Sequence, residues 1–279
     1  SANDTDPCGQ MEYLHASLKD VRQRGRRAYI ISHIPPVINL FGVLVDMVGL
    51  SNSAYWADRF TTGYKDLLVW YQDVIAVQFF GHTHQFSFLA DLEMGVPLFI
   101  IPSVTPVFGN NPSYLVATAD PTTWAITSLR QRYLSQAHKW IDGIELSDVF
   151  NNNNLTVAGL NDGAGKLIAN HQVYDEFVVV HSGGIIADTD YLRTCVSEQC
   201  RRIVSCSMQH TEAANVSSCT SMEETLLTRS VNVAVYVMFA FGVLITVVSL
   251  ARLVYHHREL ASDEADEVEL KAEVDSDHN

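Results

Sequence analysis

Three histidines stand where buried strands are predicted to end. The apolar run 74–80 stops at Gly81, and His82 and His84 follow with one residue between them. Upstream, the short apolar run A-Y-I-I-S ends at His33, and Ile-Pro-Pro comes next. Side chains converge at the carboxyl ends of strands in α/β sheets, and neutral imidazole is the commonest metal ligand.

A lone H-x-H pair is more often structural than metal-binding. Here a second strand also ends in histidine, and the glycine before the pair lets the backbone turn sharply so that both rings can point to one place. We therefore predict that His33, His82 and His84 are metal ligands. The other histidines considered are predicted to be ordinary surface or core residues: His15, His138, His171, His181 and His210.

The elements that must position these histidines form a predicted α/β layout. An amphipathic helix is predicted over 9–24 and a strand over 28–32. This strand is continuously apolar, so we predict that both of its faces are buried. The order helix, strand, helix, strand and then several strands indicates an α/β sheet with an antiparallel or mixed edge. The remaining elements are predicted at 55–71 (helix), 74–80, 97–102, 114–119 and 123–129 (strands), and 166–180 (helix).

Residues 37–50, V-I-N-L-F-G-V-L-V-D-M-V-G-L, are unusually apolar for a connection between elements. A hydrophobic helix packed on the core is the favoured interpretation. The alternative is a lip beside the site that touches lipid or an acyl chain.

A second apolar segment has the length of a membrane span. Residues 231–250 carry no charge, and about 20 residues cross the hydrocarbon of a bilayer. Arg252 and Arg258 follow this segment, whereas Arg229 alone closely precedes it, so the positive-inside rule places the tail in the cytoplasm and residues 1–229 in the lumen or outside the cell. Lysosome or vacuole, secretory pathway and cell surface all fit this topology.

The net charge of −14 is concentrated in that tail. From Glu259 to the end there are nine acidic residues and one lysine, which gives −8 over 21 residues. A nucleic-acid-binding protein would show a basic face, so we predict that the chain has no nucleic-acid-binding surface.

The cysteines fit an oxidising compartment. Four lie close together (Cys195, Cys200, Cys206 and Cys219), without the C-x2-C pairs of a zinc cluster. Two disulfides are predicted; three connectivities are possible, and local pairing of 195 with 200 and 206 with 219 is favoured. Cys8 is left over. Sequons at Asn3, Asn154 and Asn215 predict glycosylation.

The ordered motifs resemble a known family. S-H-I-P-P followed by Q-F-F-G-H-T-H is similar to the second half of the calcineurin-like metallophosphoesterases, and more closely to the acid sphingomyelinase and acid sphingomyelinase-like phosphodiesterase branch. The segments D-P-C-G-Q-M-E-Y-L, I-P-S-V-T-P-V-F-G-N-N-P-S-Y and the cysteine region extend the resemblance over about residues 5–220.

The resemblance implies a fold and a domain order. Residues 1–143 would be the carboxyl-terminal half of a metallophosphoesterase β-sandwich flanked by helices, and 144–229 a small helical region with disulfides. A transmembrane helix over 230–251 and an acidic cytoplasmic tail over 252–279 would follow.

The resemblance also implies a chemistry. Two divalent metal ions, zinc in this branch, would be bound, one by His33 and His82 and the other by His84. The substrate would be a phosphodiester, either a sphingomyelin-like lipid or a nucleotide. Paired metals polarise phosphoryl oxygens and generate a hydroxide that attacks phosphorus in line.

Some family motifs do not occur in the chain. The amino-terminal motifs D-x-H, G-D-x-x-D and G-N-H-D/E are missing, so we expect this chain alone to lack part of the metal-ligand set and the catalytic residues. Two alternatives therefore stay open, an endopolyphosphatase-like hydrolase and a non-catalytic membrane-anchored fragment.

Overall fold

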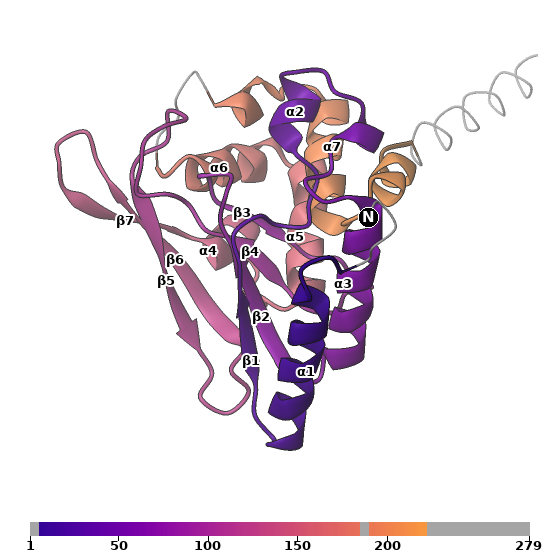
Figure 1. Ribbon diagram of the computed structural model, residues 1–279. Helices are drawn as coiled ribbons and strands as arrows, with labels where there is room; N and C mark the ends of the chain where they lie inside the picture. Colours follow the sequence, from indigo (N-terminus) through magenta and orange to yellow (C-terminus); the bar gives the residue numbers. More distant parts are fainter. Residues whose placement is uncertain (1–5, 185–189, 222–279) are drawn as a thin grey trace, which may run out of the picture. The chain divides into compact units, whose positions relative to one another are not determined.

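The structure, a computed structural model, describes residues 6–184 and 190–221, which belong to one compact unit, Ser1–Ser221. Two β-sheets and a set of helices make up this unit, as Figure 1 shows. The predicted mixed α/β class is confirmed. Residues on both sides of the predicted boundary at 143/144 contribute to one core, and the boundary itself stays a prediction.

The first sheet places two of the histidines at one edge. Its strands lie in the order β1-β2-β4-β3, with β3 antiparallel to β4 and the other neighbouring pairs parallel. Because β1 and β2 are parallel and Ile31 is in register with Phe79, their carboxyl ends meet. The strands are β1 (Ala28–Ile31), β2 (Ile75–Phe80), β3 (Ser87–Leu89) and β4 (Leu98–Ile100).

Helices α1 (Gln10–Gln23) and α3 (Asp58–Tyr71) cover one face of this sheet (Figure 1). Leu18 and Leu68 pack there with the apolar side chains of β2 and β4. Gln78, the polar residue within the β2 run, is also fully buried. Its Nε2 donates to the Val96 carbonyl at 3.1 Å, and its Oε1 accepts from the Tyr64 hydroxyl at 2.7 Å, so its burial is compensated.

The strand predicted at 28–32 was expected to be buried on both faces, and for β1 this prediction was wrong. Tyr29 is 38% exposed and Ile31 is 75% exposed, whereas Ala28 and Ile30 pack under α1 and α3. Helices α1 and α3 cover only the face that bears Ala28 and Ile30, and Tyr29 and Ile31 point to the opposite face at the edge of the sheet. An apolar run cannot show whether the far side of its strand is covered.

The second sheet is antiparallel, in the order β5-β6-β7. The strand predicted at 123–129 begins later, because residues 120–123 form a turn around the Asp120 carboxylate. It also extends further, to Leu134. Strand β7 was not predicted; it is largely exposed and bears ion pairs to β6, Arg132–Asp142 and Arg130–Glu145, each at 2.6 Å. The strands are β5 (Ser113–Ala119), β6 (Ile126–Leu134) and β7 (Trp140–Glu145).

The helix predicted near 166–180 is two helices, α5 (Val157–Ala169) and α6 (His171–His181). Asn170 separates them, because its side chain accepts hydrogen bonds from the backbone N–H groups of Gln172 and Val173 and so caps α6. The other helical elements are α2 (Leu40–Leu44), α4 (Leu146–Phe150), α7 (Glu198–Gln209) and the short 3-10 turns η1 (Leu50–Asn52) and η2 (Tyr191–Thr194).

The main core joins the two sheets to the carboxyl-terminal helices. Val77 and Phe99 of the first sheet and Leu129 of the second share it with Leu160 of α5 and Phe177 of α6. The core therefore fixes both sheets and the helices that follow them as one body.

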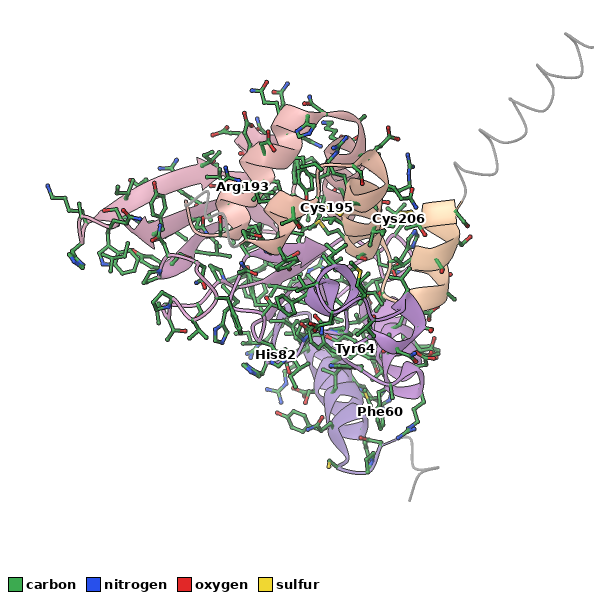
Figure 2. The ribbon with its side chains drawn as sticks, turned by 90° about the horizontal axis from the view of Figure 1, so that it is seen from above. Phe60, Tyr64, His82, Arg193, Cys195 and Cys206 are labelled. Atoms are coloured by element: carbon green, nitrogen blue, oxygen red, sulfur yellow. A yellow bond between two sulfur atoms is a disulfide. The ribbon has the colours of Figure 1, made fainter. Side chains whose placement is uncertain are left out.

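Both locally paired disulfides are confirmed. Cys195 bonds Cys200 and Cys206 bonds Cys219, with Cα–Cα distances of 5.2 and 5.9 Å. Cys195 and Cys206 lie among the carboxyl-terminal helices in Figure 2, and Cys8 is an exposed free thiol.

Within residues 6–184 and 190–221, no helix has both the length and the apolar character that a membrane span requires. The predicted span at 231–250 lies outside the described part of the chain.

Candidate functional site

The carboxyl ends of β1 and β2 bring His33 and His82 together. The Ser32 N–H donates to the Phe79 carbonyl at 3.0 Å, and the Gly81 N–H donates to the His33 carbonyl at 2.9 Å. These bonds extend the strand pairing to the histidines. The two imidazole rings meet edge to face with their centroids 5.3 Å apart. The proximity predicted from two strand ends is therefore present.

The turn after β2 holds both of its histidines in an uncommon backbone conformation. His82 has φ 75° and His84 has φ 64°, in the left-handed region that glycine favours. The turn is fixed by the Thr83 hydroxyl, which donates to the Gln85 carbonyl at 3.0 Å, and by the Ser103 N–H, which donates to the His84 carbonyl at 2.9 Å. Non-glycine residues in this region cluster at functional sites, because surrounding contacts must hold them there.

The surroundings of His82 favour the neutral form of its imidazole ring. Partial burial lowers the pKa of His82, and the neighbouring His33 and His84 lower it further. The Nδ1 atom of His84 is buried without a hydrogen-bond partner among the described residues. A neutral ring and a buried free nitrogen both suit metal ligation.

The three histidines fit the role of metal ligands but do not form a full site. Within the described ranges, no group of three or more His, Cys, Asp or Glu side chains is arranged to hold a metal ion. Catalytic zinc usually has three protein ligands. The described residues thus supply fewer ligands than such a site needs.

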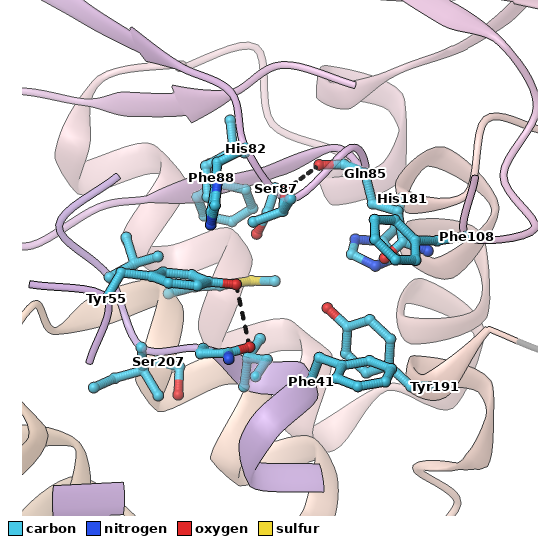
Figure 3. Close-up of a pocket in the computed structure, with 17 residues that line it drawn as sticks. Phe41, Tyr55, His82, Gln85, Ser87, Phe88, Phe108, His181, Tyr191 and Ser207 are labelled. Carbon is cyan, nitrogen blue, oxygen red and sulfur yellow. Dashed lines mark hydrogen bonds between the residues drawn. The ribbon is translucent and has the colours of Figure 1, made fainter. Parts of the chain in front are cut away.

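A cavity of about 510 Å³ lies next to His82, and Figure 3 shows labelled side chains arranged around it. It lies between the 37–41 segment, the strands of the first sheet and the carboxyl-terminal helices. Most of its lining is apolar or aromatic; the lining residues are Val37, Ile38, Asn39, Leu40, Phe41, Tyr55, His82, Thr83, Gln85, Ser87, Phe88, Ile100, Phe108, His181, Tyr191, Ser207 and Met208.

The apolar stretch 37–50 has features of both predictions, a hydrophobic helix packed on the core and an apolar lip beside the site. Leu40 and Leu44 pack against the main core, as the core interpretation predicts. Phe41 lines the cavity and is 46% exposed, and Met47 is 82% exposed. The segment therefore covers the core with some side chains and presents others beside the site.

His181, which ends α6, is a cavity residue that the sequence did not single out. It is 2% exposed, and its Nδ1 lies 2.6 Å from the Phe86 carbonyl. A carbonyl can only accept, so Nδ1 carries the proton; Nε2 is buried without a partner in the described part of the chain. The only sequence signal was its place at a helix end before Ser-Gly-Gly.

The burial of His181 predicts a pH effect on stability. Desolvation lowers its pKa, although the nearby Asp190 carboxylate and the bond to Phe86 act in the opposite direction. The unfolded chain takes up this proton at about pH 6.5 and the folded chain only at lower pH. Unfolding therefore binds a proton, and we expect stability to fall as the pH drops below about 6.5.

Urea unfolding between about pH 7.5 and 5.5 measures this effect. In the variant His181→Phe the decline should be shallower than in the wild type. The exposed His171→Phe is the control and should keep the wild-type slope. Equal slopes in all three proteins would contradict the prediction.

The predicted glycosylation sites differ in their surroundings. Asn154 is exposed in the 151–154 connection. Asn215 is half-buried and its Nδ2 donates to Glu212 at 3.3 Å. Asn3 lies among the residues that the structure does not describe. Glycosylation of all three stays a prediction.

Known proteins with similar sequences are phosphodiesterases. A "sphingomyelinase phosphodiesterase D" of Dictyostelium discoideum is 25% identical over 211 residues, which is 68% of this chain and 45% of that protein. The human "cyclic GMP-AMP phosphodiesterase SMPDL3A" is 34% identical over 144 residues, 48% of this chain and 30% of that protein. The human "sphingomyelin phosphodiesterase" is 33% identical over 124 residues, 42% of this chain and 17% of that protein.

No family model matches the chain. The chain spans less than half the length of each of these relatives. The aligned regions nevertheless cover about half to three-quarters of the chain in several of the curated homologues. The chain is thus similar in sequence to acid sphingomyelinase-like phosphodiesterases, the branch that its motifs resemble.

Proposed function

We propose that these residues supply the histidine side of a metal-dependent phosphodiester hydrolase site of the acid sphingomyelinase-like type. The observation that carries the proposal is that His33 and His82 meet at the ends of two parallel strands, with His84 near enough to lower the pKa of His82. The similarity to named phosphodiesterases supports the reaction class.

His33 and His82 would hold one divalent metal ion, zinc in this branch, and His84 a second. Bound metal ions would supply Lewis-acid polarisation of the phosphoryl oxygens and activation of a water. The chain's own contribution is to fix the ligands: the Gly81 N–H holds the His33 carbonyl, and the Ser103 N–H holds the His84 carbonyl. The lowered pKa of His82 keeps its ring neutral and able to bind.

Further ligands would be needed to complete the site, because the described residues hold no cluster of three ligands. There is room for them beside the histidines: among the described strands β1 pairs only with β2, and the adjacent Ile31 is 75% exposed.

Zinc binding to the full 279-residue chain tests the proposal. Two imidazoles hold zinc more weakly than a three-ligand site, so we expect equilibrium dialysis to show weak zinc binding by the wild type. His82→Ala should lose it, because removing one of the two ligands leaves a single imidazole. The exposed His171→Ala is the control. Equal zinc binding by both variants would contradict the site, whatever the activity of the chain.

We propose in addition that residues 1–229 face the lumen or the cell exterior and that 231–250 anchor them in the membrane. The uncharged segment and the flanking arginines support this. In intact vesicles from expressing cells, protease added outside should remove only the acidic tail. Digestion of the histidine region with protection of the tail would reverse the orientation.

A further inference from the structure

The imidazole ring of His82 contacts two other rings. Its centroid is 5.3 Å from that of His33 and 5.0 Å from that of Tyr55, and the interplanar angles are 83° and 88°. Metal-binding histidines are usually oriented by a hydrogen bond to the second ring nitrogen. Among the described residues, no hydrogen bond engages a ring nitrogen of His82. The direction in which this ring points is therefore set by the side chains that it packs against.

Tyr55 is the ring contact of His82 that is not itself a proposed metal ligand, and it is fixed at both ends. Its backbone N–H donates to the Val37 carbonyl at 3.1 Å, and its hydroxyl donates to Asn39 Oδ1, also at 3.1 Å. The second bond is the dashed line drawn from Tyr55 in Figure 3. Burial raises the pKa of the Tyr55 hydroxyl, so the hydroxyl keeps its proton at neutral and acidic pH and can donate there.

The next residue along the chain extends this support to the other histidine. Trp56 Nε1 donates to the carbonyl of Ile34, the residue that follows His33, at 3.1 Å. The Trp56 ring also meets that of Tyr64 in α3, with centroids 5.3 Å apart. Residues 55 and 56 therefore contact both segments that carry His33 and His82, and α3 supports them.

Asn39 connects the same tyrosine to helix α2. Its Oδ1 accepts from the backbone N–H of Gly42 at 3.1 Å, which caps the helix, and it also accepts from the Tyr55 hydroxyl. One side-chain oxygen thus holds both the start of α2 and the ring that packs on His82. Loss of this oxygen would release the tyrosine as well as the helix end.

We propose that Tyr55 is a positioning residue that holds the imidazole of His82 in the orientation needed to bind a metal beside His33, and that Asn39 acts on the site through Tyr55. The inference deepens the proposed function and rests on it for the link to metal binding. Side chains that form a site need support that locks their rotamers. An aromatic residue that only filled the core could be replaced without moving His82 relative to His33.

NMR of the metal-free full chain with labelled histidine rings measures this positioning directly. The wild type should show a nuclear Overhauser contact between the rings of His33 and His82, and the single alanine variants of these histidines identify the two signals. In Tyr55→Leu we expect this contact to weaken, because the His82 ring is free to turn. Tyr55→Phe, which keeps the ring, should retain more of it.

Tyr174→Phe is the matched control, because it also loses a buried tyrosine bond, from its hydroxyl to the Leu192 carbonyl at 2.7 Å. It should keep the contact between His33 and His82. An unchanged contact in Tyr55→Leu would overturn the inference. Equal weakening in Tyr55→Leu and in the control would also overturn it, since the effect would then come from the fold as a whole.

Zinc affinity measures the link to the site. Tyr55→Leu should weaken zinc binding by roughly two- to tenfold, the size of a typical aromatic contact, and Tyr55→Phe by less. Asn39→Ala should also weaken it, and adding Tyr55→Phe to Asn39→Ala should cause no further loss, because both changes remove the same bond. Additive losses would contradict the role given to Asn39, and wild-type affinity in Tyr55→Leu would contradict the role given to Tyr55.

The two measurements separate this inference from the proposed function. Absence of zinc binding by the wild type would count against the metal site, and the NMR comparison would still decide whether Tyr55 positions His82. Zinc binding that depends on His82 but not on Tyr55 would support the metal site and overturn the inference.

Discussion

Under the proposed function, replacing His82 by alanine should remove nearly all metal-dependent phosphodiester hydrolysis by the protein. The ring of His82 meets that of His33 with centroids 5.3 Å apart, and both His33 and His84 lower the pKa of His82. Loss of an outer partner of a metal ligand typically costs about 10–100-fold, so loss of the ligand should cost at least about 100-fold in kcat/KM.

The measurement is hydrolysis of bis(p-nitrophenyl) phosphate with and without EDTA. His171→Ala, an exposed position on α6, should keep the wild-type rate. The prediction would fail if His82→Ala retained EDTA-sensitive turnover close to that of the control.

Removing the Cys206–Cys219 disulfide should have the largest effect on stability. This bond closes a loop with a sequence separation of 13, and Cys206 is fully buried with Ile38 and Val216. Loop-closure entropy assigns such a loop about 3 kcal/mol of stabilisation. We expect the double variant Cys206→Ala, Cys219→Ala to lose about that much free energy of unfolding, or more because buried packing is also lost.

The second disulfide provides a matched comparison. Cys195–Cys200 has a sequence separation of only 5, for which the same relation gives about 2 kcal/mol. Urea unfolding of both double variants should therefore rank the 206–219 pair above the 195–200 pair. The reverse order would show that local packing, rather than loop length, decides the contribution.

The features of the fold and of the site that could be predicted from the sequence are those set by residues close together along the chain. The strand ends before His33 and His82 were marked by apolar runs that stop at proline or glycine. The local disulfide pairs were favoured because short spacings bring cysteines together. Each of these features depends on residues close along the chain, so the sequence alone could indicate them.

The parts that the sequence missed depend on distant neighbours. Strand β7 has no apolar alternation, because it is largely exposed and its ion pairs come from Arg130 and Arg132 of another strand. Ile31 is exposed because it points away from α1 and α3, on a face of β1 that the described elements leave open. The position of His181 in the cavity depends on its contacts with Phe86, just before β3, and with Tyr191 of the 3-10 turn η2.

The left-handed backbone at His82 and His84 lowers the stability of the fold at the positions proposed to bind metal. A side chain in this conformation costs roughly 1 kcal/mol compared with glycine, and the G-H-T-H turn bears that cost twice. A screen for thermal stability alone would therefore tend to replace these histidines by glycine or asparagine. Under the proposed function both imidazoles would bind metal, and the turn would serve that binding at the expense of how firmly the chain folds.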